Sequence, residues 1–381
     1  MLNSLCLFSG IGGAALAMST ANVKTKAYCD IDRFSQKVLY NLMKRKLIDK
    51  GPIFNDITEL KGSDLPWSVD CISSGFPCQG ISSMGKRLGF QDERTQLVNH
   101  VFRLIDECDP TYIQLENVAA IIKTEGYENL LGELVHRGYR CAFMTLSAAQ
   151  VGAAHSRKRW FLLGVKNHKN GKVLRVSSSK IATLKSHFKQ KVHHKLVPRS
   201  NASATSFCKG LGNAVVPAQA AESLKVLNDT LNQSTDAMPM VSLKSMSRKY
   251  PVVVETDDSG QLVFFQNISY VVPDPSCKSE TFTVHAPTDS LGSPKTQRVT
   301  ASRSGLKCIP TPRTGSNCSV PAASMTERSL RDSGTFLVNS RELWSQGDIQ
   351  SSPERRERMV SSHYLAATMG FPMEWLDDSL S

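Results

Sequence analysis

The first 165 residues alternate between short apolar runs and longer segments with helical periodicity. The expected strands are residues 3–10, 25–32, 69–77, 110–118 and 157–165, and the expected helices are residues 13–21, 34–47, 95–108 and 129–138. Strands separated by helices at this spacing predict a parallel sheet whose crossover connections are helical. We therefore expect residues 1–165 to form an α/β domain with helices on both faces of the sheet.

The chain changes character after residue 165. Residues 166–208 are basic and serine-rich, and we expect a linker or arm there. Residues 209–234 read as a loop that enters a helix with an apolar stripe, which we expect to pack back on the first domain. Residues 235–362 are rich in Ser, Thr, Pro and Gly with short β-prone runs, and predict a smaller, irregular, strand-rich domain. Residues 363–381 are expected to return to the first domain.

Cysteine spacing and hydropathy exclude several classes of protein. The ten cysteines include no CxxC pair and no histidine partner at zinc-ligand spacing, so neither a disulfide framework nor a metal site is expected. Reduced thiols indicate a cytoplasmic location. No run approaches the ~18 apolar residues that a membrane span needs, and the apolar N-terminus lacks the basic region of a signal peptide.

The formal net charge of +12 implies an acidic partner, with nucleic acid as the first candidate. Residues 166–208 hold 10 of the 46 Lys and Arg and none of the 34 Asp and Glu. Two interpretations stay open for this segment, a phosphate-binding arm and a solvated flexible linker. Its cations are Lys166, Lys169, Lys172, Arg175, Lys180, Lys185, Lys189, Lys191, Lys195 and Arg199.

A glycine-rich turn, "FSGIGG" at residues 8–13, follows the first expected strand and opens the first helix. Glycines at this place let the backbone approach a ligand closely. Asp30 ends the second strand about 20 residues later, where carboxylates bind ribose hydroxyls in nucleoside-binding sheets. Asp32 is interpreted as the N-cap of the next helix, and Asp56 repeats the pattern after a third short strand. Together these residues predict a nucleoside-type cofactor.

The loop "SSGFPCQGISS" places Cys78 among glycines and serines that cannot build a core. The alternative is a buried structural cysteine, which this loop setting disfavours. A thiolate nucleophile needs an acid or base nearby, and Glu116 at the end of the strand 110–118 supplies one. Desolvation there is expected to raise the pKa of Glu116 and favour its protonated form.

Arg157 and Arg159 alternate along the expected strand 157–165 and should share a face. Such a pair can hold an anion or a carbonyl oxygen, and the alternative is a solvated charged strand edge.

The motifs "LFSGIGG", "GFPCQ", "LENV" and "SRKRWFLLG", in this order and spacing, resemble the DNA (cytosine-5) methyltransferase family, which uses S-adenosylmethionine. "KGLGNAVVPAQA" resembles the last motif of that family and extends the resemblance to about residue 225. The resemblance implies a Rossmann-like methyltransferase sheet in residues 1–165 and a target-recognition domain in residues 235–362.

The resemblance also implies roles for individual residues. Cys78 would be the nucleophile, Glu116 would engage nitrogen 3 of cytosine, and Arg159 of the Arg157–Arg159 pair would lie near the carbonyl oxygen of the base. The residues implied to bind the cofactor are Phe8, Gly10, Ile11 and Gly12 at its methionine end, Asp30 at its ribose, Ile31 and Asp56 at its adenine, and Pro77, Leu97 and Asn213 around the rest of the pocket.

Two features depart from the family pattern. His155 stands where the family has the glutamine of its QxRxR motif. Only the 44 residues 165–208 separate "SRKRWFLLG" from "KGLGNAVVPAQA", too few for a recognition domain, and "ATMGFPMEWLDD" follows GN-V-P although it ordinarily precedes it. We therefore infer a rearranged C-terminal half.

The expected activity is methyl transfer to carbon 5 of cytosine in duplex DNA, with the base flipped out of the helix. Two alternatives stay open, the same chemistry on transfer RNA and a catalytically silent binding protein. We expect a monomer whose partners are duplex DNA and a cognate restriction endonuclease, with no membrane association.

Overall fold

The structure is a computed structural model of the chain. The described residues are 1–77, 97–166, 172–190, 196–198, 206, 210–232, 237–240, 251–256, 261–267, 282–285, 296–299, 307–310, 335–338, 358–360 and 362–375. Cys78 and the other residues between them are outside this description.

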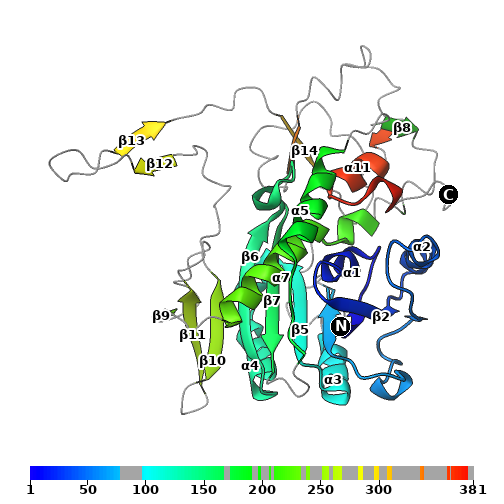
Figure 1. Ribbon diagram of the computed structural model, residues 1–381, viewed down its shortest axis with the longest axis vertical. Helices are drawn as coiled ribbons and strands as arrows, with labels where there is room; N and C mark the ends of the chain where they lie inside the picture. Colours follow the sequence, from blue (N-terminus) through cyan, green and yellow to red (C-terminus); the bar gives the residue numbers. More distant parts are fainter. Residues whose placement is uncertain are drawn as a thin grey trace.

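One large twisted sheet organises the described chain, with the strand order β3-β2-β1-β4-β5-β7-β6-β10-β11-β9 (Figure 1). Its strands are β1 (Leu2–Leu7), β2 (Val23–Cys29), β3 (Ile53–Phe54), β4 (Cys71–Ser74), β5 (Tyr112–Val118), β6 (Arg140–Ser147), β7 (Lys158–Val165), β9 (Ala237–Met240), β10 (Val252–Thr256) and β11 (Leu262–Asn267). Strands β1 to β5 pair in parallel, whereas β7 runs antiparallel to both β5 and β6. The expected Rossmann-like α/β sheet is confirmed, but the expectation of parallel strands throughout is wrong for β7, and β6 was not anticipated.

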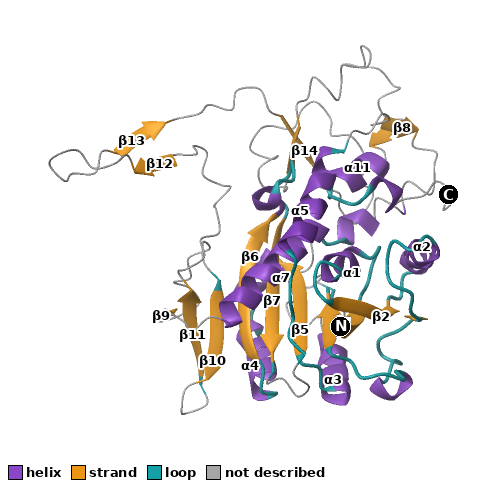
Figure 2. Cartoon of the chain, in the orientation of Figure 1, coloured by secondary structure: helices purple, strands orange, loops and turns teal. Residues whose placement is uncertain are grey.

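Helices cover both faces of this sheet (Figure 2). They are α1 (Gly13–Met18), α2 (Arg33–Lys44), α3 (Val98–Cys108), α4 (Tyr127–His136), α5 (Ser178–Ser186), α7 (Pro217–Asn232) and α11 (Ser362–Thr368), with short 3-10 turns at Gly62–Asp64, Ala119–Lys123, Ala148–Val151, His187–Lys189 and Met373–Trp375. Alternation along β1 explains the two layers, because Leu5 and Leu7 pack with α3 and α4 while Leu2 packs with α1, α5 and α7.

Residues 172–190 pack on the sheet domain. Leu174, Ile181 and Leu184 are buried in the cluster that contains α1 and α7. The cation of Lys172 pairs with the buried carboxylate of Asp70 at 3.0 Å. Two further cations of the segment are also engaged, since Lys185 pairs with Glu222 at 2.8 Å and Lys180 donates to the Ser19 carbonyl at 2.9 Å. Neither a free arm nor a flexible linker therefore describes residues 172–190, because three apolar side chains anchor them.

The boundary expected at residue 235 differs in the structure. Val252, Val253 and Val254 of β10 are fully buried, and β10 pairs with β6 on one side and β11 on the other. An all-apolar run of this kind fits an interior strand that is covered on both faces, which explains why β10 extends the first sheet. Strands β9, β10 and β11 thus contribute to this sheet and not to a separate domain.

The remaining described segments are short strand pairs. They are β12 (Phe282–His285) with β13 (Thr296–Val299), β14 (Lys307–Pro310) with β15 (Thr335–Val338), and β16 (Arg358–Val360) with β8 (Leu196–Pro198). Within the ranges given above, no helix has the length and hydropathy of a membrane span, and no group of three His, Cys, Asp or Glu side chains is placed to hold a metal ion.

Candidate active site

The candidate site residues follow one row of the sheet. Leu7 of β1 pairs with Cys29 of β2 and with Ser74 of β4, and Ser74 pairs in turn with Leu115 of β5. The residue after each of these, namely Phe8, Asp30, Gly75 or Glu116, therefore lies at the same carboxyl edge of the parallel strands. Ligands of open α/β sheets bind outside this edge.

The glycine turn after β1 has a left-handed backbone at three positions. Phe8, Gly10 and Gly12 have φ angles of 52°, 51° and 87°. The carboxylate of Asp30 accepts the Gly10 N–H at 2.6 Å and, with its other oxygen, the Asp32 N–H at 2.9 Å. The shape of the turn is thus held by the strand next to it.

The helix that follows Asp30 begins as expected. The carboxylate of Asp32 accepts the backbone N–H of Ser35 at 3.0 Å, so the interpretation of Asp32 as the N-cap of α2 is confirmed.

Space lies open beside the glycine turn, since a Cβ built on Gly10 would meet no heavy atom within 4 Å. Ile31, two residues after the end of β2, is 73% exposed although it is a large apolar residue. Asp56 is partly exposed and accepts the Thr58 N–H at 2.8 Å. An open cradle bordered by an apolar side chain and carboxylates fits a nucleoside cofactor.

The other expected cofactor residues fall into two groups. Pro77 and Leu97 are partly buried, and Asn213 is exposed. The side chain of Ile11 is only 1% exposed and packs in the core beside Val38. A ligand at this turn would therefore meet the backbone of Ile11 and not its side chain.

Glu116 and Arg159 form the central ion pair of the edge. The Arg159 Nε lies 2.9 Å from a Glu116 carboxylate oxygen, and the two side chains are 17% and 19% exposed. Burial raises the pKa of Glu116 above its ordinary value, and the charges of Arg159 and Arg157 oppose that rise. The pair therefore places a carboxyl group of raised pKa beside a guanidinium cation at this edge.

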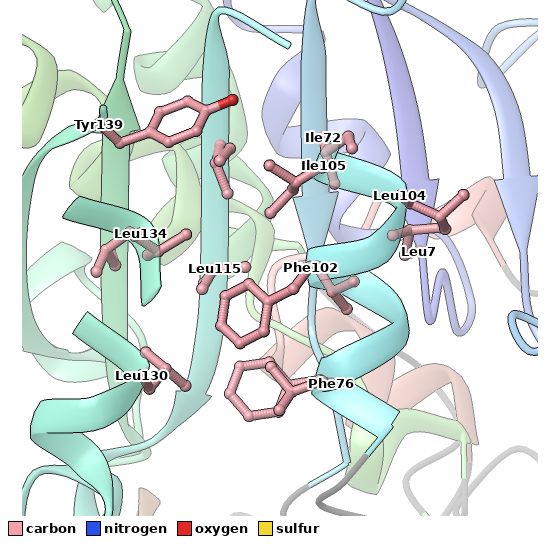
Figure 3. Close-up of a cluster of buried hydrophobic side chains, with 14 of the residues drawn as sticks. Leu7, Ile72, Phe76, Phe102, Leu104, Ile105, Leu115, Leu130, Leu134 and Tyr139 are labelled. Atoms are coloured by element: carbon pink, nitrogen blue, oxygen red, sulfur yellow. The ribbon is translucent and has the colours of Figure 1, made fainter. Parts of the chain in front are cut away.

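The chain that leads to Cys78 is anchored beside this pair. A Cβ on Gly75 would lie 3.1 Å from Glu116 Oε2, so this glycine allows the loop to approach the carboxylate. The Phe76 ring is buried in the core near Phe102 (Figure 3). The side chain of Asn117 donates to the Phe76 carbonyl at 3.2 Å and fixes the start of the loop against β5. Cys78 itself lies outside the described residues.

Arg157 binds backbone carbonyls of the GN-V-P loop. Its side chain is 5% exposed, and one terminal nitrogen donates to the carbonyls of Gly212 and Ala214 at 2.9 and 2.8 Å. These carbonyls flank Asn213 in the GN-V-P motif. Arg157 precedes β7 and binds backbone carbonyls, whereas Arg159 lies within β7 and pairs with Glu116. Arg157 thus holds a loop of the expected cofactor pocket.

Two buried side chains that the sequence did not single out as site residues brace the same region. Gln219, in the first turn of α7, donates to the carbonyls of Leu146 and Arg157 at 2.7 and 3.0 Å. His155 accepts the Arg157 N–H at Nδ1 and, through the Nε2 of its neutral ring, donates to the Thr368 carbonyl at 3.2 Å. Burial lowers the pKa of His155 to about 3, with the nearby Arg157 charge adding to the effect. In the sequence, the only sign that Gln219 has a structural role was its position as a polar residue within the apolar stripe of α7.

The family of C-5 cytosine-specific DNA methylases matches residues 2–377 of the chain. The protein belongs to this family. The matched range includes the glycine turn, the GFPC loop, the Glu116 strand and the C-terminal segment.

Individual relatives match smaller parts of the chain. The Type II methyltransferase M.CviJI of Paramecium bursaria Chlorella virus IL3A is 34% identical over 163 residues, 43% of each chain. The Type II methyltransferase M2.BsuMI of Bacillus subtilis (strain 168) is 32% identical over 164 residues, 41% of this chain and 40% of its own. Among solved structures, S. pombe Dnmt2 methyltransferase is 26% identical with a TM-score of 0.37, over 48% of this chain and 55% of that chain. The matches thus span less than half the length of these curated relatives.

The raised pKa of Glu116 gives a pH test. Because the folded protein binds this proton more tightly than the unfolded chain, the carboxyl's contribution to stability is present below the ordinary pKa of 4.5 and is lost as the pH rises through the folded value. We expect the wild type to lose stability relative to Glu116→Gln across this window, as measured by urea unfolding at a series of pH values. Arg159→Met should raise the pKa of Glu116 further, so the loss of stability should extend to higher pH. If the stability of the wild type relative to Glu116→Gln instead rises with pH, the raised pKa of Glu116 is contradicted.

Substitution of Arg157 and substitution of Arg159 should change the free energy of unfolding by different amounts. Arg157→Met leaves two buried carbonyls without their donor and should cost about 3 kcal/mol of unfolding free energy. Arg159→Met breaks one partly exposed pair and should cost about 1 kcal/mol, while still removing a group beside Glu116. Urea unfolding of both variants measures this contrast. A fully stable Arg157→Met protein would contradict the role of Arg157 in holding the loop.

Proposed function

We propose that this methylase transfers a methyl group from S-adenosylmethionine to carbon 5 of cytosine in duplex DNA. The observation that carries the proposal is the Glu116–Arg159 pair at the same sheet edge as the open glycine turn, in a chain that the cytosine methylase family matches over residues 2–377. Cytosine methylation requires an acid, which Glu116 would supply, a cation, which Arg159 would supply, and a cofactor site, which the glycine turn would form.

S-adenosylmethionine supplies an electrophilic methyl group when bound. The residues fit it as a nucleoside cofactor, with the open side of Gly10 for its methionine end, Asp30 for its ribose, and Ile31 with Asp56 for its adenine. Asp30 already accepts the Gly10 N–H, so one carboxylate would both shape the turn and bind the ribose.

Cys78 would act as the nucleophile. It lies three positions after Gly75 in the sequence, a span of at most about 11 Å between Cα atoms, and a Cβ on Gly75 would lie 3.1 Å from the Glu116 carboxylate. Addition of the thiolate to carbon 6 of cytosine forms a C–S bond, and the electron pair displaced from the ring double bond makes carbon 5 nucleophilic. A protonated Glu116 stabilises this electron-rich ring by donating at nitrogen 3, which the raised pKa favours.

Arg159 would orient the base and its acid partner. The guanidinium pairs with Glu116 through Nε and donates to the Lys158 carbonyl through Nη1, and its remaining N–H groups would bind the carbonyl oxygen of the ring. After carbon 5 receives the methyl group, a base removes its proton and the C–S bond breaks, so the thiolate and the aromatic ring are restored. The target must first leave the DNA stack, because a stacked carbon 6 is unreachable.

The proposal extends to the setting of the reaction. The matched relatives are Type II methyltransferases, which supports the expectation of a companion restriction endonuclease. We expect the enzyme to act as a monomer in the cytoplasm, where its DNA substrate would be.

Bisulfite sequencing of a plasmid from cells that express the protein tests this function. Wild-type protein should leave methylated cytosines in one defined sequence context, and Cys78→Ser should leave none because the C–S bond cannot form. Cys108→Ser is the matched control, since this cysteine lies in α3 and should not change methylation. Methylation by Cys78→Ser, or methylation confined to transfer RNA in a parallel assay, would overturn the proposal.

A further inference from the structure

The C-terminal segment, residues 362–375, closes on the glycine turn from the far end of the chain. The indole N–H of Trp375 donates to the Ile11 carbonyl at 2.8 Å, and the Trp375 ring is buried. A Cβ on Gly12 would lie 3.2 Å from the edge of that ring, and one on Gly13 would lie 3.2 Å from the Phe371 ring. The segment therefore forms the back wall of the turn.

The bond from Trp375 acts on a single peptide group. The Ile11 carbonyl and the Gly12 N–H belong to the same planar peptide, and the Gly12 N–H donates to the Ser9 carbonyl at 3.0 Å. This peptide is thus held from both sides, by Ser9 and by Trp375. Gly10 and Gly12, which flank Ile11, have left-handed φ angles and wide conformational freedom, so a hydrogen bond from another segment has most effect there.

The segment is itself held by the arginine loop. The Nε2 of His155 donates to the Thr368 carbonyl, and Leu365, Met369 and Phe371 are buried in one cluster with Ile11. The cofactor turn and the loop of Arg157 are therefore joined through α11.

We propose that Trp375 is a positioning residue for cofactor binding, in which its indole N–H fixes the peptide between Ile11 and Gly12 in the orientation that S-adenosylmethionine requires. The inference rests on the proposed function for the identity of the ligand. The effect of Trp375 on the turn stands on the geometry alone.

Trp375→Phe keeps a ring in place and removes the donor. In the ligand-free protein, hydrogen exchange followed by mass spectrometry should show faster exchange in peptides that cover residues 8–18. Calorimetric titration should show S-adenosylmethionine binding about five- to tenfold more weakly, the effect of one lost hydrogen bond. Affinity for DNA and kcat at saturating cofactor should not change.

Trp160→Phe is the matched control. Trp160 is also buried and donates its indole N–H, to the Tyr127 hydroxyl at 2.9 Å, but it packs in the cluster with α3 and α4. This variant should lose a similar amount of thermal stability while exchange in residues 8–18 and cofactor affinity stay at wild-type values. Equal weakening of cofactor binding by both variants would show a general effect of instability and overturn the proposal.

The outcomes separate the two proposals. Wild-type protein that fails to bind S-adenosylmethionine would reject the proposed function, whereas normal binding by Trp375→Phe would reject the positioning role alone. If Trp375→Phe does not fold, the indole N–H resonance of Trp375 in the wild type, assigned by Phe substitution of the other three tryptophans, should shift on titration with S-adenosylmethionine. An unmoved resonance would also overturn the proposal.

Discussion

The hydrogen-bond register of the parallel strands determines where every other part of the site can lie. Leu7, Cys29, Phe54, Ser74 and Leu115 occupy one row across β1 to β5. Since the strands are parallel, the chain leaves all of them on the same side, and the next residues form one edge. A shift of one residue in any strand would turn its side chains to the other face and remove a group from this edge. The glycine turn, Asp30 and Glu116 therefore depend on backbone pairing before any side chain contributes.

Segments from the second half of the chain complete the site from behind. Arg157, His155 and Gln219 are buried donors or acceptors that link the β7 loop to the GN-V-P loop and to α11. A buried guanidinium needs its hydrogen bonds satisfied, and the two carbonyls that flank Asn213 satisfy part of that need. The rearranged order of the motifs is compatible with this packing, because contact between segments and not their sequence order decides which groups meet.

Local sequence patterns were sufficient for much of the sheet domain. The alternation of strands and helices, the Asp32 N-cap and the placement of Glu116 at a strand end followed from periodicity and turn residues. Strand β7 was expected to be parallel but is antiparallel to β5. The direction of a strand depends on tertiary pairing, which no local sequence pattern encodes. Charge composition was likewise misleading for residues 172–190, where Leu174, Ile181 and Leu184 anchor a segment that reads as a basic linker. Strand β10 was placed in a separate domain because a short apolar run does not show which sheet it joins.

The central claim is that Cys78 attacks a cytosine held beside Glu116 at this edge. Duplex DNA with 5-fluorocytosine at the target tests it directly, since the last step must remove the substituent of carbon 5 as a cation and fluorine cannot leave in that form. The account predicts a denaturation-resistant complex that forms only with S-adenosylmethionine and in which mass spectrometry finds the nucleotide on the peptide that contains Cys78. An adduct on another residue, or turnover of unmodified DNA with no adduct on the fluorinated substrate, would contradict it.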